Sequence, residues 1–178
     1  MIIVEGCDGT GKSTLVNRLS ADLGLNIGKR GVADRDKLYT VTREDTYKAL
    51  AHAVEGYLPP YIWDRLYFSE PIYSRIMGRK CEFTLSESNF VRSVLKAIRC
   101  PIIICHVPLE VATENMEQKH QMEAVSDNFQ YIHKAYEGLI NLTRDWATTF
   151  DYRDEGAYAS LREDIKRYTV LRKEREWH

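Results

Sequence analysis

The sequence predicts an α/β fold: one domain, residues 1–178, in which a central parallel sheet of about five strands lies between layers of helices. Two observations support this prediction. Short apolar segments alternate along the chain with longer segments of helical periodicity, which is typical of strands joined by right-handed crossovers. In addition, residues 102–107 are apolar on both faces, as expected of a central strand in a parallel sheet. Ligands bind such sheets at the C-terminal ends of the strands, so functional residues are expected there.

The N-terminal half of the chain is predicted to contain two strands and two helices. Residues 2–4 are apolar and precede a glycine-rich turn, after which apolar residues recur at helical spacing: Leu15, Val16, Leu19 and Leu23. A second helix is predicted to begin after Thr42, because Thr42 and Asp45 have the spacing of a helix N-cap. A double proline ends this helix, and residues 61–63 follow as a buried strand with charged residues at its C-terminal tip.

The C-terminal half continues the alternation. Residues 84–87 form a capping box before a helix, and Pro108 is suited to the first turn of the helix after the central strand. One long helix is predicted from about residue 123, with apolar side chains on one face: Val125, Phe129, Ile132, Tyr136, Leu139 and Trp146. Phe150 is assigned to a last short strand. Residues 157–175 are assigned to a C-terminal helix, whose interspersed acids and bases indicate a solvated face and not a nucleic-acid surface.

Composition excludes several classes of protein. Hydrophobic residues make up 44% and charged residues 29% of the chain, which is ordinary for a globular protein and argues against disorder. The net charge of −1 gives no general attraction to nucleic acids or membranes. No apolar stretch approaches the roughly 20 residues of a membrane-spanning helix. The 4 cysteines form no CxxC pair, and the chain opens without a signal-peptide pattern, so a cytoplasmic protein with reduced thiols is expected.

Residues 6–13 fit the phosphate-binding pattern GxxxxGK[ST], between a predicted strand and a predicted helix. Glycines allow backbone N–H groups to point at a polyphosphate without a Cβ in the way, and the helix N-terminus adds its dipole. Lys12 is expected to reach the β- and γ-phosphates, and the Ser13 hydroxyl to ligate Mg²⁺. ATP with Mg²⁺ is therefore the implied donor. The residues expected to bind it are Gly6, Asp8, Gly9, Thr10, Gly11, Lys12, Ser13 and Thr14.

A phosphate loop alone does not separate a kinase from a GTPase, an ATPase motor or a nucleotide-binding module. A second motif narrows the choice: Asp64 and Arg65 follow the strand at 61–63, and Ser69 and Tyr73 lie on the next segment. A neighbouring acid and base at a strand end also fit a structural salt bridge, which stays an alternative interpretation of Asp64 and Arg65.

Together the two motifs resemble those of the thymidylate kinase-like family of nucleoside monophosphate kinases, particularly the short members encoded by bacteriophages. That family opens with a strand followed by E-G-x-D/E-G-x-G-K-S/T, which residues 5–13 match. It continues with a D-R-aromatic motif followed by a serine and a tyrosine. The corresponding residues in this sequence are Asp64, Arg65, Ser69 and Tyr73. The resemblance spans roughly residues 1–145 and implies the P-loop kinase fold.

The resemblance implies ATP-dependent phosphoryl transfer to a deoxynucleoside monophosphate, with thymidylate as the leading acceptor, and it suggests a homodimer. Arg65 would bind the acceptor phosphate, Asp8 would bond the 3′-hydroxyl of the acceptor sugar, and Asp64 would lie near Mg²⁺. Lys12, Arg65 and Asp64 are then the catalytic residues, and Ser13 and Asp64 the metal ligands. Contacts with the acceptor are expected from Asp8, Arg65, Phe68 and Tyr73.

Two segments depart from the family pattern. The T-R-E-P-G segment is absent, and residues 42–45 only echo it. The lid, at about residues 113–124, offers Lys119 and His120 where the family has arginines. A basic cluster could supply the missing positive charge, and it fits a solvated surface equally well. Its members are Arg75, Arg79 and Lys80. His106, within the apolar run, is expected to be a hydrogen-bonded core residue.

These departures leave two further functions open. The alternative is a kinase that phosphorylates a hydroxyl of a nucleoside, or of a modified base in DNA such as a hydroxymethyl pyrimidine. Nucleic acid would be a partner only under that alternative. The third function is a non-enzymatic nucleotide-binding module.

Overall fold

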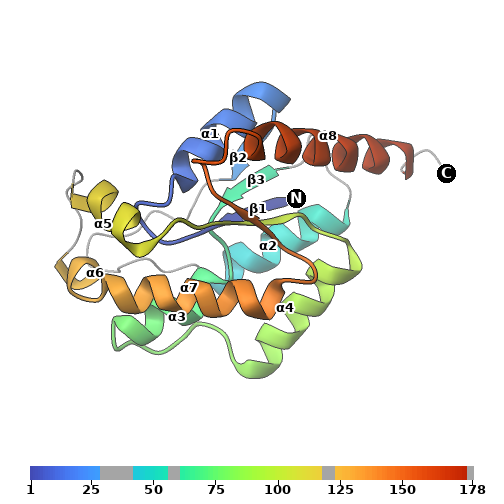
Figure 1. Ribbon diagram of the computed structural model, residues 1–178. Helices are drawn as coiled ribbons and strands as arrows, with labels where there is room; N and C mark the ends of the chain where they lie inside the picture. Colours follow the sequence, from blue (N-terminus) through green and yellow to red (C-terminus); the bar gives the residue numbers. More distant parts are fainter. Residues whose placement is uncertain (29–41, 56–60, 118–122, 176–178) are drawn as a thin grey trace.

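The computed structural model describes residues 1–28, 42–55, 61–117 and 123–175, and it contains a five-stranded sheet (Figure 1). All strand pairs are parallel, and the strand order is β2-β3-β1-β4-β5. The predicted α/β class is therefore confirmed. The strands are β1 Ile2–Glu5, β2 Asn26–Gly28, β3 Tyr61–Asp64, β4 Ile102–Cys105 and β5 Thr148–Phe150.

The register of the central strands brings their C-terminal ends to one edge of the sheet. β1 lies between β3 and β4, with Val4 opposite Asp64 and Glu5 opposite Ile104. The loop that leaves β1 therefore starts beside the end of β3 and the end of β4. This arrangement places the phosphate-binding motif and the Asp64-Arg65 motif next to each other, as the sequence predicts.

Helices cover both faces of the sheet (Figure 1). Alternate residues of β1 point to opposite faces. Ile2 and Val4 pack with α1 (Lys12–Leu23) and α8 (Ala157–Arg175), whereas Ile3 belongs to the core on the other side. That second core is closed by α2 Arg43–Val54, α3 Ser69–Ile76, α4 Leu85–Ala97 and α7 Phe129–Thr143. The remaining two helices, α5 Leu109–Glu117 and α6 Glu123–Asp127, contact α7.

Local sequence signals account for several helix starts. The Thr84 hydroxyl accepts the Glu87 backbone N–H, and the Glu87 carboxylate accepts the Thr84 N–H, so the predicted capping box before α4 is confirmed. The Thr42 hydroxyl accepts the Asp45 N–H at the start of α2. None of the helices in the described ranges combines the length and the apolar character that crossing a bilayer requires.

Four details differ from the sequence prediction. The single helix from residue 123 is wrong, because Asn128 interrupts it with φ −111° and ψ 12°, and its carbonyl accepts the first N–H bonds of α7. Trp146 lies beyond the end of α7. β2 was not predicted, since it is a three-residue strand whose first two residues are exposed, and it leaves no apolar run. Finally, β4 ends at Cys105, so His106 lies just past it with a partly exposed ring.

Candidate functional site

The loop of residues 6–11 passes closely over the ends of neighbouring elements, which explains its glycines. Gly6 has φ +146°, and a Cβ there would lie 2.6 Å from the Cys105 carbonyl oxygen. Gly9 has φ +77°, and a Cβ there would overlap the backbone carbonyl of Ala112 on α5. Both positions thus need a residue with no side chain for steric reasons as well as for their left-handed backbone.

Replacing Gly9 with alanine is expected to destabilise the fold by at least about 1–3 kcal/mol, because the new Cβ meets backbone at a strained φ. Gly138 is the matched control: it lies within α7 with open space around it, so alanine there should stabilise the protein by about 0.5–1 kcal/mol. Urea unfolding of the two variants measures both effects. A Gly9→Ala variant as stable as the parent would show that the loop has another conformation in solution.

Lys12, Ser13 and Asp64 meet where α1 begins and β3 ends. The Lys12 ammonium forms an ion pair with one Asp64 carboxylate oxygen, and the two side chains are 6% and 14% exposed. The Ser13 hydroxyl donates to the other carboxylate oxygen at 3.3 Å. A hydroxyl and a carboxylate are oxygen ligands of the kind that Mg²⁺ binds in proteins. The structure therefore brings the predicted metal ligands together beside the predicted phosphate-binding lysine.

Asp8, Arg65 and Tyr73 form a second polar centre at the loop. Arg65 is 3% exposed and donates to one Asp8 oxygen at 3.0 Å, while the Tyr73 hydroxyl donates to the other at 3.1 Å. The Arg65 guanidinium also lies over the Tyr73 ring, 4.7 Å from its centroid. Arg65 has φ +66°, a conformation that L residues rarely adopt. The backbone turn at the tip of β3 thus directs this cation to the loop carboxylate.

The charge state of this centre follows from its surroundings. Burial opposes ionisation of Asp8, but the positive charges of Arg65 and Lys12 and the hydrogen bonds from Arg65 and Tyr73 outweigh it and lower the pKa of the carboxyl group. Burial raises the pKa of the Tyr73 phenol well above its usual value. Asp8 is therefore an anion and Tyr73 a neutral donor at neutral pH.

Glu5 is a site residue to which sequence reasoning gave no role. It is fully buried, and its carboxylate accepts the Leu66 backbone N–H at 2.8 Å and the Ser69 hydroxyl at 2.6 Å. Burial raises the pKa of Glu5, while the bonds from Ser69 and Leu66 act in the opposite direction. Through these bonds the carboxyl group holds the turn that follows Arg65 against the end of β1. The sequence signal that could have predicted this role is a charged residue at the end of an apolar strand.

The structure also contains a pocket of about 420 Å³ beside the loop, which the sequence did not predict. The Arg18 guanidinium lies 3.5 Å from the centroid of the Tyr158 ring, and the Asn115 amide donates to the Gly9 carbonyl at 2.7 Å. Its lining comes from the phosphate loop, α1, α5, β5, the connection after β5 and α8, so no local pattern could reveal it. Its lining includes Thr14, Arg18, Asn115, Phe150, Tyr152 and Tyr158.

The other predicted site residues have varied positions. Phe68 is 4% exposed and packs against Tyr67 and Trp146, so its contact with an acceptor stays a prediction. Arg79 forms an ion pair with the buried Glu70, whereas the other two members of the basic cluster, Arg75 and Lys80, are exposed. Of the predicted lid, Lys119 and His120 lie outside the described residues.

Solved structures of other proteins share this architecture. No family model matches the chain, and no curated protein matches its sequence. The structure of YorR from Bacillus subtilis, in complex with phosphorylated GDP, superposes with a TM-score of 0.70 at 19% identity, over 99% of this chain and 98% of that one. Deoxyadenosine kinase from M. mycoides with bound dATP superposes with a TM-score of 0.62 at 16% identity, over 93% of this chain and 98% of that one. The same kinase with bound dCTP gives 0.58 at 19%, over 94% and 99%.

The chain has a P-loop kinase-like fold. At these identities the similarity shows the fold alone.

Proposed function

We propose that the protein is an ATP-dependent phosphotransferase acting on a deoxynucleoside monophosphate, with thymidylate as the leading acceptor. The observation that carries the proposal is that two buried cations lie at one loop, each beside a carboxylate. Lys12 lies beside Asp64 at the start of α1, and Arg65 lies beside Asp8 within the loop. One cation can neutralise the donor phosphates while the other holds the acceptor phosphate, which is the arrangement that phosphoryl transfer requires. The nucleotides bound to YorR and to the M. mycoides kinase agree with this proposal.

The pocket beside the loop is the proposed site of the donor nucleoside. It adjoins Gly9 and Gly11, so a triphosphate in the loop would place its base near Arg18 and Tyr152. Arg18→Ala is expected to raise the ATP KM by about tenfold with little change in kcat, because the guanidinium would stack on the bound base, a contact that contributes about 1–2 kcal/mol. Steady-state kinetics with varied ATP measure the effect. Arg162→Ala on α8, whose side chain is 43% exposed, is the control; an unchanged ATP KM in Arg18→Ala would contradict the proposed donor pocket.

Mg²⁺ fits the oxygen ligands of Ser13 and Asp64. When bound there it would neutralise charge on the transferring phosphoryl group. Lys12 would then exchange its Asp64 partner for the donor phosphates, which the loop N–H groups would orient. EDTA is expected to abolish turnover and added Mg²⁺ to restore it, and Ser13→Ala should raise the Mg²⁺ concentration needed for half-maximal rate. Full activity in a metal-free assay would refute this assignment.

The second candidate function is phosphorylation of a hydroxyl on a nucleoside or on a modified base in DNA. One observation favours it: a solved protein with this fold is a deoxyadenosine kinase, whose name describes a nucleoside acceptor. In that case Arg65 would have no acceptor phosphate to bind.

An ATP-consumption screen tests these functions together. The acceptors are nucleosides, nucleoside monophosphates and oligonucleotides with and without hydroxymethyl pyrimidines. Turnover that depends on a deoxynucleoside monophosphate supports the main proposal, and turnover that depends on a nucleoside or an oligonucleotide supports the second. Phosphate release that no acceptor stimulates would instead favour a nucleotide-binding module.

A further inference from the structure

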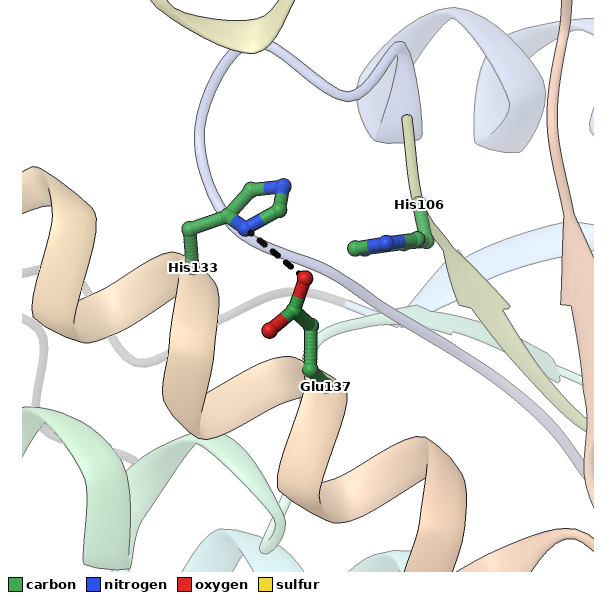
Figure 2. A group of neighbouring side chains, drawn as sticks. All are labelled: His106, His133 and Glu137. Carbon is green, nitrogen blue, oxygen red and sulfur yellow. Dashed lines mark ion pairs between the residues drawn. The ribbon is translucent and has the colours of Figure 1, made fainter. Parts of the chain in front are cut away.

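Three metal-ligating side chains lie together where β4 meets α7. His106 follows β4 directly, and His133 and Glu137 lie one helical turn apart on α7. One ligand atom from each residue lies within 4.8 Å of the other two. Figure 2 shows the two imidazoles and the carboxylate gathered around a common space. None of the three takes part in the phosphate site described above.

The tautomer of His133 is set by the backbone. The ring is 3% exposed, and its Nε2–H donates to the Val107 carbonyl at 2.8 Å. In the neutral imidazole this bond leaves Nδ1 with its lone pair directed at the cluster. The Nδ1 atom is 3.7 Å from a Glu137 carboxylate oxygen, which is longer than a hydrogen bond. A backbone carbonyl that holds the far nitrogen in this way is the usual support of a metal-binding histidine.

His106 supplies a second available nitrogen. Its Nδ1 is buried and has no hydrogen-bond partner among the described residues. Neutral imidazole is the form that binds metals, and a buried nitrogen without a partner is placed to do so. The two rings are tilted at 40° with centroids 4.7 Å apart. Simple ring packing would explain this contact, but it leaves the buried His106 nitrogen without a partner.

We propose that His106, His133 and Glu137 bind a divalent transition-metal ion, with Zn²⁺ as the best match to two imidazoles and one carboxylate. Zinc takes four ligands in tetrahedral geometry, and the half-exposed Glu137 leaves the fourth position to solvent. Metal–ligand distances of about 2.0–2.2 Å would draw the three atoms together through side-chain rotation. The bound ion would link the end of β4 to α7. This site is independent of the proposed kinase activity.

Titration of metal-free, full-length protein with Zn²⁺, in buffer that contains Mg²⁺ to occupy the oxygen site, tests the proposal. We expect one high-affinity equivalent by calorimetry, and a tetrahedral visible spectrum when Co²⁺ replaces zinc. His106→Ala and Glu137→Gln should each weaken the affinity by at least about tenfold. The matched controls are His52→Ala and Glu110→Gln, which change exposed residues on other helices and should bind as the parent does.

Thermal unfolding provides a second measurement, because an ion that binds only the folded state raises the melting temperature. Zn²⁺ should do so in the parent and in both controls, and it should not in the double variant His106→Ala with Glu137→Gln. Circular dichroism without zinc establishes that the variants are folded. Absence of zinc binding to the parent overturns the proposal. Equal zinc affinity in the parent and the two cluster variants overturns it as well, because the ion would then be held elsewhere, for example by cysteines.

Discussion

Lys12→Met is expected to lower kcat by at least about 10²- to 10³-fold, the loss typical when one preorganised charge-stabilising group is removed. The ammonium is buried at the start of α1, beside the loop that is proposed to hold the donor phosphates. Methionine keeps the length and volume of the stem but removes the charge. Single-turnover and steady-state assays with saturating ATP and acceptor measure the effect. Turnover close to that of the parent would refute the proposed donor site.

The Lys12 prediction needs a stability control, because the same side chain neutralises Asp64. Removing one member of a partly buried ion pair leaves the other without compensation and can destabilise the fold. The double variant Lys12→Met with Asp64→Asn removes both charges and should recover stability in urea unfolding without recovering activity. Recovery of activity in the double variant would show that the loss came from a misfolded site and not from a missing cation.

Arg65→Ala is expected to raise the acceptor KM by about 10- to 100-fold, since a charge-assisted contact to a phosphate contributes about 1.5–3 kcal/mol. The ATP KM should change little. Lysine at this position should rescue only part of the loss, because its point charge cannot reproduce the planar fork of arginine. Alanine keeps the positive-φ strain of position 65, so the comparison reports the side chain. Kinetics with varied acceptor at saturating ATP measure the effect.

Two further variants sharpen the Arg65 test. Asp8→Asn removes the charge that holds the Arg65 guanidinium and should also raise the acceptor KM, whereas Arg75→Ala, an exposed arginine on α3, should not. If Arg65→Ala weakens ATP and acceptor alike, or leaves turnover of a nucleoside unchanged, the role in binding an acceptor phosphate is wrong. Phosphorylation of a hydroxyl on a nucleoside or on a modified base would then be the favoured function.

The sequence predicts those parts of the molecule that depend on neighbouring residues. The phosphate loop is continuous in sequence, and the buried strands at β1, β3 and β4 are short apolar runs, so both are visible without coordinates. The position of Asp64 beside the loop also follows, because parallel strands end at one edge. The break at Asn128 was missed, since a single non-helical residue barely disturbs the apolar periodicity on either side.

Features that depend on distant segments could not be predicted. Glu5 bonds Leu66 and Ser69, more than 60 positions along the chain, and only the folded sheet brings them together. The pocket beside the loop, and the cluster of His106, His133 and Glu137, likewise combine residues from separate elements. The position of His106 within the apolar run 102–107 predicted a core role for it, and the sequence does not reveal that β4 ends one residue earlier, at Cys105.

At Arg65 the backbone conformation lowers the stability of the fold, whereas the side chain is needed for the proposed reaction. A bulky L residue at φ +66° is disfavoured by about 1–2 kcal/mol relative to glycine. Glycine at the tip of β3 would relieve this strain but would leave the buried Asp8 carboxylate without its cation, so selection for thermal resistance favours it only together with an uncharged residue at position 8. A laboratory lineage evolved only for heat tolerance should drift toward an inert protein by this paired route, whereas one selected for turnover should retain both charges and gain its stability elsewhere in the chain.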